Sequence, residues 1–239
     1  VIEIEFDGEL ELDLHYNYVV QSFLYRNLSE GLARFLHDKG FEYNKRKFKM
    51  FTFSRLEGRY RIEDSRIKFK APVHLTLSSP YNKFLEEFLN SLLRASSLRL
   101  GGNRIRVSSI EIMNPEVIGK NIKVRTLTPI VVYSTFVTMN NRKKTYYYSP
   151  FEPEFSELIY KNLVKKYMAF YGKGIKSRRF KMEVVGRPVE KVLKYRDIII
   201  RGWMGKFEIE GDKRLLELGY ESGFGSKNSQ GFGLVEVIK

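Results

Sequence analysis

Three histidines are the side chains of this chain best suited to move protons at neutral pH, namely His15, His37 and His74. An imidazole, with an ordinary pKa near ~6.5, can act as a general acid or as a general base. His37 has the surroundings most typical of a functional residue, because it ends a predicted helix and a basic run follows it closely. We expect His74, within an apolar strand-like segment, to be structural and His15 to be exposed in a loop. His37 is therefore the first candidate for a catalytic residue.

Other kinds of catalytic chemistry find little support in the residue types. The chain has no Cys, which excludes a thiol nucleophile, a disulfide framework and a cysteine-based zinc site. The acidic residues form no Asp-x-Asp or Glu-x-x-His arrangement, so the sequence predicts no metal centre. None of the Gly-Lys pairs at 119–120, 172–173 and 205–206 is followed by Ser or Thr, as a phosphate-binding P-loop requires. We therefore expect chemistry that uses neither a metal nor another cofactor.

The chain is strongly basic, with 42 Lys and Arg against 28 Asp and Glu and a net charge of +14. A charge-rich surface of the thermophile type would also suit this composition, but its charges would alternate in sign. Here they cluster, because Lys45, Arg46 and Lys47 are adjacent and a second run without acidic residues spans 165–181. Clustered cations favour a polyanionic partner, and we expect a nucleic acid. The second run contains Lys165, Lys166, Lys173, Lys176, Arg178, Arg179 and Lys181.

Hydrophobic residues make up 43% of the chain, which is enough for a packed core. No segment reaches the ~18–20 uninterrupted apolar residues that a membrane span needs. Acidic residues interrupt the apolar ones throughout the first eleven positions, which argues against a signal peptide. We therefore expect a cytoplasmic protein that does not contact a membrane.

The periodicity of the apolar residues predicts two tandem units of the same architecture. Alternation at 1–6 predicts a strand, helical spacing predicts helices over 18–28, 32–40 and 80–93, and further strands are expected at 48–56, 59–70 and 105–112. Beyond Asn114-Pro115 and Gly119, we expect strands at 122–127, 130–138, 179–186, 198–209 and 234–238, a helix at 154–170, and a short helix through Leu218 with Asp212 as its N-cap. The first series follows the order β-α-β-β-α-β of a ferredoxin-like, or RRM-like, unit, and the second follows it when one extra hairpin near 130–148 is allowed. We predict an α+β chain with a first domain over 1–116 and a second over 117–239.

A glycine-rich segment near the end of the chain is its most unusual stretch. Gly-Phe-Gly occurs at 223–225 and again at 231–233. Glycine permits positive φ and close approach of the backbone to a ligand, so the segment is suited to bind phosphates through its N–H groups. In the alternative interpretation Phe224 and Phe232 plug the core, and both interpretations can hold together. The candidate phosphate contacts are Gly223, Gly225, Lys227, Asn228, Ser229, Gly231 and Gly233.

The same segment resembles a known family. Residues 223–237 read Gly-Phe-Gly-Ser-Lys-Asn-Ser-Gln-Gly-Phe-Gly-Leu-Val-Glu-Val. They resemble the C-terminal signature of the sixth family of CRISPR-associated proteins, endoribonucleases within the RAMP superfamily. The resemblance implies two ferredoxin-like units and metal-independent cleavage of precursor CRISPR RNA within its repeats. In that reaction the 2′-hydroxyl attacks the adjacent phosphate, leaving a 2′,3′-cyclic phosphate and a 5′-hydroxyl.

The resemblance also implies a catalytic group of three residues. Its histidine matches His37, its tyrosine matches Tyr25 on the preceding helix, and its lysine matches Lys49 on the following strand, with Lys47 as the weaker match. One continuous helix would place Tyr25 and His37 ~18 Å apart. The chain therefore has to turn between them, at Ser29-Glu30-Gly31. Whether His37 is the acid or the base stays open.

CRISPR repeat RNA is the expected partner, and the chain is expected to be a monomer or a homodimer. Outside the glycine-rich segment, the expected RNA contacts are Lys45, Arg46, Lys47, Arg178 and Arg179. Other CRISPR-associated effector subunits are further candidate partners. One alternative function is that of a non-catalytic RNA-binding subunit of the same superfamily, and a weaker one is that of a basic ribosome-associated or RNA-chaperone protein. The three candidate catalytic residues favour the enzyme, because a binding protein needs no such group.

Overall fold

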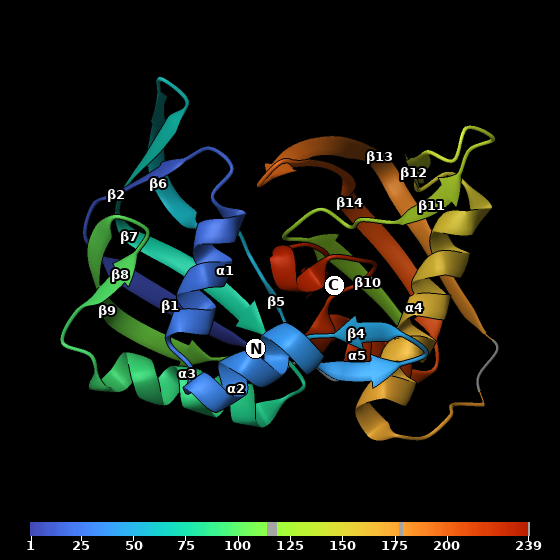
Figure 1. The fold of residues 1–239 in the computed structure, drawn as a ribbon, viewed down its shortest axis with the longest axis horizontal. Helices are drawn as coiled ribbons and strands as arrows, with labels where there is room; N and C mark the ends of the chain where they lie inside the picture. Colours follow the sequence, from blue (N-terminus) through green and yellow to red (C-terminus); the bar gives the residue numbers. More distant parts are fainter. Residues whose placement is uncertain (114–118, 177–178, 239) are drawn as a thin grey trace.

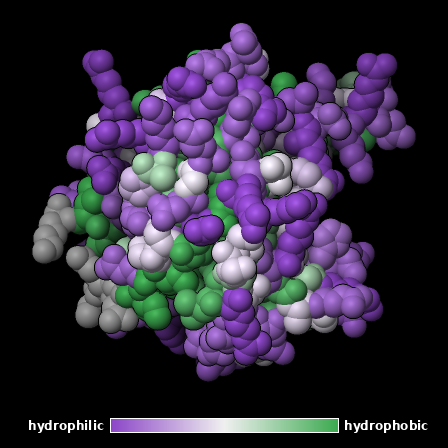
Figure 2. Space-filling model, turned by 90° about the vertical axis from the view of Figure 1, so that its left-hand side faces the viewer, coloured by the Kyte–Doolittle hydropathy of each residue, from purple (hydrophilic) through white to green (hydrophobic). Residues whose placement is uncertain are grey.

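Two antiparallel sheets stand side by side, each with helices packed on one face (Figure 1). The structure, a computed structural model, describes residues 1–113, 119–176 and 179–238. Most side chains on the face seen in Figure 2 are hydrophilic, with a smaller hydrophobic area in its lower part. No helix in these three ranges is long and apolar enough to cross a membrane.

The first unit contains the elements before residue 113. Its main sheet has the order β2-β7-β1-β9-β8, and β5 and β6 also pair with β7. The path β6-β7-β1-β9 within it has the strand order of a ferredoxin-like unit. The elements are β1 (Ile2–Asp7), β2 (Leu10–Asp13), α1 (Asn17–Arg26), α2 (Glu30–Arg34), the π-helix η1 (Phe35–Lys39), β3 (Phe41–Tyr43), β4 (Arg46–Phe48), β5 (Thr52–Phe53), β6 (Glu57–Glu63), β7 (Arg66–Ser78), α3 (Asn82–Arg94), β8 (Leu98–Leu100) and β9 (Asn103–Ile112).

The core of the first unit lies between its sheet and helices α1 and α3. Alternate residues of β1 are buried, as a half-buried strand requires. Residues four apart on α3, namely Phe84, Phe88 and Leu92, are buried on one helix face. Phe88 meets Phe23 of α1 edge to face at 5.9 Å between ring centroids, so the two helices share one apolar layer over the sheet.

The second unit repeats this arrangement with the strand order β13-β14-β10-β15. Asp212 caps α5 by accepting a 3.0 Å hydrogen bond from the backbone N–H of Arg214, as the sequence predicts. The elements are β10 (Asn121–Thr126), β11 (Tyr133–Val137), β12 (Lys143–Tyr147), α4 (Pro153–Tyr171), β13 (Phe180–Tyr195), β14 (Ile198–Gly211), α5 (Lys213–Ser222), the 3-10 helix η2 (Asn228–Gln230) and β15 (Val235–Ile238). The prediction of two tandem ferredoxin-like units is confirmed. The predicted domain boundary at 116/117 falls outside the described residues and stays a prediction.

Two predicted strands are wrong. Residues 59–70 form a hairpin and not one strand, because β6 ends at Glu63 and β7 begins at Arg66, with Asp64 and Ser65 at positive φ between them. Residues 48–56 do not form a single strand, because β4 ends at Phe48 and β5 begins at Thr52. Met50, between them, has a φ of 58°, a left-handed conformation that a strand cannot contain. A tight hairpin precedes the break, since Asn44 and Lys45 at the β3–β4 turn also have positive φ. This segment therefore turns sharply and leads toward the second unit.

The glycine-rich segment, residues 223–233, lies between the two units. Phe224 is fully buried in the second core, and Phe232 is fully buried in a small cluster with Val131 and Ile200. Both phenylalanines thus plug the interior, as the alternative interpretation predicts. Gly233 has a φ of +76°, and a Cβ added to it would lie 2.0 Å from the carbonyl oxygen of Phe224. The glycine is therefore required for contact between two stretches of the segment itself.

We predict that Gly233→Ala destabilises the protein more than Gly172→Ala does. Both glycines have positive φ, but a Cβ at Gly172 would have open space around it. Gly172→Ala should therefore lower the free energy of unfolding by about 1–2 kcal/mol, the cost of the left-handed conformation. Gly233→Ala should cost a further ~1–3 kcal/mol, because the backbone must shift to make room. Chemical denaturation of both variants measures the difference, and equal losses would contradict the packing role.

Candidate active site

Tyr25 and His37 come together because the chain turns between α1 and α2. Helix α1 ends at Arg26, and the Ser29 hydroxyl accepts a hydrogen bond from the backbone N–H of Leu32 to begin α2. The rings of Tyr25 and His37 meet edge to face with 6.0 Å between centroids. The chain therefore turns between Tyr25 and His37 as predicted, but at residues 27–29 and not at 29–31, because Glu30 already begins α2, and the two side chains share one site.

His37 lies in the π-helix η1, and 76% of its side chain is exposed. Its Nδ1 is 2.7 Å from a carboxylate oxygen of Asp38, and this hydrogen bond holds the pKa of Asp38 below its ordinary value. An ionised carboxylate only accepts hydrogen bonds, so Nδ1 carries the proton. In the neutral ring the lone pair then lies on Nε2, which makes Nε2 the nitrogen that can take a substrate proton.

Lys49 lies in the connection between β4 and β5, and not on a strand as the sequence predicts. Its ammonium donates a hydrogen bond to the backbone carbonyl of His37, and Lys47 donates one to the carbonyl of Asp38 at 2.8 Å. Burial, and then the nearby charge of Lys47, lower the pKa of Lys49. Gly40 permits this approach, because a Cβ there would lie 2.6 Å from the carbonyl oxygen of Phe48. Both lysines are thus fixed against the turn that carries the histidine.

Tyr25 is partly buried between His37 and Phe51, whose ring centroid is 6.0 Å from its own. Burial raises the pKa of the Tyr25 phenol, with a smaller contribution from Tyr195. At neutral pH the phenol therefore keeps its proton. It can donate a hydrogen bond in this site but cannot serve as the base.

A cationic pocket of about 260 Å³ adjoins this group, between the β4–β5 connection, α4 and the glycine-rich segment. We call it the junction pocket. Lys47 and Lys49 line this pocket. They also donate hydrogen bonds to backbone carbonyls of η1, residues 35–39, which we call the histidine turn. Every charged side chain among the described residues that line it is a cation, which makes it suited to bind an anion. The cations are Arg46, Lys47, Lys49, Lys166 and Lys227.

The predicted RNA contacts divide into two groups by their position. Arg46, Lys47, Lys227, Asn228 and Ser229 line the junction pocket. Lys45, at the tip of the β3–β4 hairpin, and Arg179, just before β13, are exposed outside it. Arg178 lies outside the described residues.

The glycines of the segment serve internal packing. Added Cβ atoms at Gly223, Gly225 and Gly231 would meet the Asn228 side chain, the Val131 carbonyl and the Phe53 ring respectively, each within 2.6 Å. The buried amide nitrogen of Asn228 donates hydrogen bonds to the carbonyls of Phe224 and Phe232 at 3.1 and 3.0 Å. The absent Cβ atoms therefore let the segment pack on itself, on Val131 of the second unit and on Phe53 of the first. Binding of phosphates by its backbone stays a prediction.

The burial of Lys166 is not among the features that we predict from the sequence. It belongs to the basic run at 165–181, but only 3% of it is exposed. Its ammonium donates hydrogen bonds to the Ser222 carbonyl, the Ser222 hydroxyl and the Gly223 carbonyl, at 3.1, 3.1 and 2.6 Å. These bonds hold the start of the glycine-rich segment to α4. A signal was available, because Lys166 shares the apolar face of α4 with Ile159 and Leu163.

The two other histidines lie away from this site. His74, on β7, is next to two carboxylates of β1, with ring nitrogens 3.2 Å from Glu3 and 3.8 Å from Glu5. His15 is exposed and accepts a hydrogen bond from the backbone N–H of Lys194. Of the three histidines, His37 alone has Tyr25 and Lys49 beside it.

Comparisons with known proteins match the whole chain. A family model described as CRISPR-associated protein Cas6, N-terminal, matches residues 11–111. A second, described as CRISPR associated protein Cas6, C-terminal, matches residues 112–237. The chain belongs to the Cas6 family. The resemblance of its glycine-rich segment to that family is thereby confirmed.

Individual proteins are similar over nearly all of their lengths. CRISPR-associated endoribonuclease Cas6 1 of Methanocaldococcus jannaschii is 32% identical, over 100% of this chain and 92% of its own length. A solved structure described as CRISPR associated protein Cas6 is also 32% identical and superposes with a TM-score of 0.79, covering 100% of this chain and 98% of its own. Another, described as an RAMP protein binding different RNA substrates, is 26% identical, with a TM-score of 0.82 and coverage of 100% and 99%.

We predict that Lys166 makes stability depend on pH above neutrality. Burial lowers its pKa from 10.5 to about 7. Between these values the unfolded chain binds a proton that the folded chain does not, so the free energy of unfolding should rise with pH in this window. Below about pH 7 both states are protonated, and the contribution of Lys166 should be constant.

Denaturation of the wild type and of Lys166→Met from about pH 6 to pH 10 measures this effect. The difference in unfolding free energy between the two proteins should move in favour of the wild type as the pH rises. Lys165→Met, at the partly exposed neighbouring position, is the matched control and should give a difference that does not vary. A constant difference for Lys166→Met as well would refute the lowered pKa.

Proposed function

We propose that this chain is an endoribonuclease that cleaves precursor CRISPR RNA within its repeats. The observation that carries the proposal is the convergence of Tyr25, His37 and Lys49 beside a cationic pocket. The chain's membership of the Cas6 family and its similarity to a protein named as an endoribonuclease support the same activity.

The proposed reaction is a transesterification that needs no metal ion. The RNA 2′-hydroxyl oxygen forms a bond to the adjacent phosphorus as the bond from phosphorus to the 5′-oxygen breaks. A base takes the proton of the 2′-hydroxyl and an acid gives one to the 5′-oxygen, so the products are a 2′,3′-cyclic phosphate and a 5′-hydroxyl. The nucleophile comes from the RNA itself. Across residues 1–113, 119–176 and 179–238, no group of three or more His, Asp or Glu side chains could hold a metal ion.

Each of the three side chains suits one part of this reaction. The His37 side chain is largely exposed and Asp38 occupies its Nδ1, which leaves Nε2 for proton transfer, as the base when neutral and as the acid when protonated. The phenol of Tyr25 keeps its proton and can donate a hydrogen bond to a phosphate oxygen. The ammonium of Lys49 can stabilise the negative charge that develops on the non-bridging oxygens.

The junction pocket is the proposed path for the RNA backbone. Arg46 of the first unit and Lys227 of the second both line it with a cation. Lys227 also lies 5.3 Å from the ring centroid of Tyr133. Phosphates held here would lie next to the histidine turn, because Lys49 lines the pocket and also donates a hydrogen bond to the His37 carbonyl.

The alternative is an RNA-binding subunit that does not cleave. It is supported by the similar structure that is described only as binding different RNA substrates. It predicts the same junction pocket without any need for Tyr25 and His37 to meet. Cleavage of repeat RNA distinguishes the two functions.

We predict that His37→Ala slows the chemical step by about 10²–10⁴-fold, the usual contribution of one positioned acid or base. Tyr25→Phe and Lys49→Ala should each cost less, because neither residue is the main proton carrier. The three losses should be sub-additive if the residues act as one unit. Single-turnover cleavage of repeat RNA measures the rates, and His74→Ala, away from the site, should leave the rate near that of the wild type.

Two further conditions test the same mechanism. Cleavage should continue in excess EDTA, and a single 2′-deoxy substitution just upstream of the scissile phosphate should abolish cleavage but leave binding nearly intact. A bridging 5′-thio leaving group needs no acid, so rescue of His37→Ala by that substrate would identify His37 as the acid. Dependence on Mg²⁺, or full activity of His37→Ala, would overturn the mechanism.

A second prediction concerns the RNA path. Replacing Arg46 and Lys227 together by Ala should weaken binding of repeat RNA and flatten its salt dependence. If each residue contacts one phosphate of single-stranded RNA, the slope of log affinity against log salt should change by roughly 1.4, or ~0.7 per contact.

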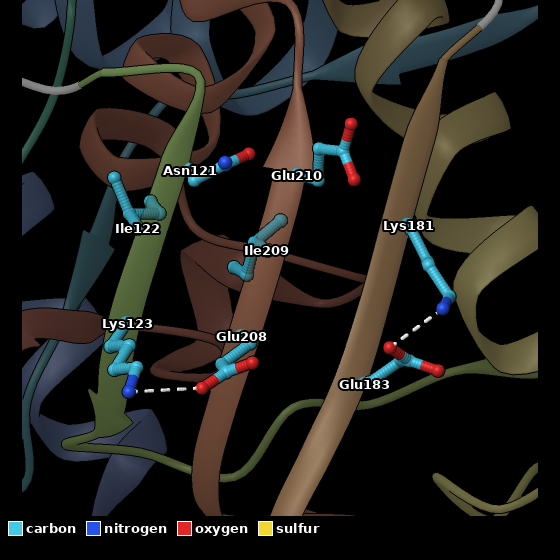
Figure 3. A pocket seen from close by; sticks show the side chains of 8 residues that line it. All are labelled: Asn121, Ile122, Lys123, Lys181, Glu183, Glu208, Ile209 and Glu210. Carbon is cyan, nitrogen blue, oxygen red and sulfur yellow. Dashed lines mark ion pairs between the residues drawn. The ribbon is translucent and has the colours of Figure 1, made fainter.

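Lys123 and Lys181 provide a control with the same change in net charge. They lie on the outer face of the second sheet, paired with Glu208 at 3.1 Å and Glu183 at 2.8 Å (Figure 3). Their double replacement by Ala should leave the slope almost unchanged. Equal slopes for the two double variants would remove the junction pocket from the RNA path.

A further inference from the structure

Two groups of contacts between the units involve helix α1, and we call them the two ties; other contacts, such as that of Phe41 with Phe170, join the units elsewhere. The first tie is the glycine-rich segment, whose backbone carbonyls accept hydrogen bonds from side chains of the first unit. Asn17 donates to the carbonyls of Gln230 and Gly231 at 2.9 and 3.4 Å, and Thr52 of β5 donates to that of Phe232 at 3.0 Å. The segment is thereby fixed to the N-terminal half of α1.

The second tie is the tip of the β13–β14 hairpin. The ring of Tyr195 meets that of Tyr18 edge to face at 6.0 Å, and the guanidinium of Arg196 lies 4.0 Å above the Tyr18 ring. Close by, the backbone N–H of Lys194 donates to Nδ1 of His15. The hairpin therefore spans from the second sheet to the beginning of α1.

Gln21 takes part in both ties. Its amide nitrogen donates to the Ser229 carbonyl of the glycine-rich segment at 2.5 Å, and its amide oxygen accepts a hydrogen bond from the Tyr195 hydroxyl. Only 7% of Tyr195 is exposed, and burial raises its pKa to about 12, so the hydroxyl is protonated and donates. An amide can donate and accept at once, which neither a carboxylate nor an apolar side chain can do.

The position of Gln21 relates both ties to the candidate active site. Asn17, Gln21 and Tyr25 are four residues apart on one helix, so they share a face. Asn17 and Gln21 hold the second unit, and Tyr25, one turn further, meets His37. A displacement of the second unit on α1 would therefore move one wall of the junction pocket relative to the histidine turn.

We propose that Gln21 is a positioning residue for the cleavage reaction. Through Ser229 and Tyr195 it sets the placement of the second unit relative to Tyr25 and His37. Its two hydrogen bonds are to the protein itself, so it acts through the residues that it holds. The effect on cleavage rests on the proposed function, whereas the effect on the placement of the units does not.

The first test measures chemistry and binding separately. Gln21→Leu removes both hydrogen bonds at similar volume, and Gln21→Glu keeps an acceptor for Tyr195 but directs an anion at the Ser229 carbonyl. Each should lower the single-turnover rate at saturating enzyme by roughly 10–100-fold, the cost of a misplacement of about 1 Å. The affinity for 2′-deoxy repeat RNA should change much less. Asn90→Leu, an exposed amide on α3, is the control and should retain the wild-type rate.

Tyr195→Phe removes only the hydroxyl and keeps the ring on Tyr18. Its loss in rate should be smaller than that of Gln21→Leu, and the double variant should lose little more than Gln21→Leu alone, because both changes break the same bond. Additive losses, or a wild-type rate for Gln21→Leu, would overturn the positioning role.

The second test measures the placement of the units without RNA. Because the chain has no Cys, Glu30→Cys on α2 and Glu157→Cys on α4 give two unique and exposed positions for spin labels. The distance distribution between the labels should broaden or shift in Gln21→Leu and remain unchanged in Asn90→Leu. An unchanged distribution in Gln21→Leu would refute the proposal, even if its rate falls. If the wild type fails to cleave repeat RNA but the distribution broadens, the proposed function is wrong and Gln21 still sets the placement of the units.

Discussion

The hydrogen bonds that fix the glycine-rich segment are the interaction on which the rest of the structure depends. At one end, the buried ammonium of Lys166 donates hydrogen bonds to the carbonyls of Ser222 and Gly223. At the other end, side chains of α1 donate hydrogen bonds to the carbonyls of residues 229–231. Each bond contributes only about 1 kcal/mol net, but a buried carbonyl left without a donor costs more. The segment can lie between the units only because donors from both of them reach it, and its position fixes the second unit relative to the first.

Function at the candidate active site follows from this placement. The three candidate catalytic residues all belong to the first unit, yet the cations beside them come from both. Lys49 joins the two parts, because it contacts the His37 carbonyl and also lines the junction pocket. The left-handed conformation of Met50 and the close approach at Gly40 make this possible, since both direct the β4–β5 connection toward the histidine turn. Two unusual backbone features thus lie beside the place where the proposed chemistry occurs.

The sequence predicts those features that depend on local pattern. Strand alternation and helical spacing are enough to give both ferredoxin-like units and an interruption between the first two helices, and the residue type of Asp212 is enough to give the cap. That Tyr25 and His37 meet across the interruption is what the resemblance implies. It does not predict the break between β4 and β5, because no proline or glycine marks the left-handed Met50. Nor is the burial of Lys166 predicted, because a basic run indicates an exposed surface. The carbonyls that accept hydrogen bonds from its ammonium become known only from the structure. The role of Gln21 depends on two segments more than 170 residues away, and a contact of that separation leaves no mark on local periodicity.

The partly or fully buried cations of the junction pocket lower the stability of the fold. Burial is the largest cause of the lowered pKa of Lys49, Lys166 and Lys227, which means that each cation is less stable there than at an exposed site. The three hydrogen bonds of Lys166 offset part of its cost, and they leave that ammonium no donor for a ligand. Lys49 and Lys227 are only partly buried, so a phosphate can still reach them. An RNA backbone in the pocket would stabilise their charged forms and relieve the cost of burying them. In the proposed function, therefore, the substrate supplies the negative charge that the lining residues lack, and its binding strengthens the same junction that positions Tyr25, His37 and Lys49.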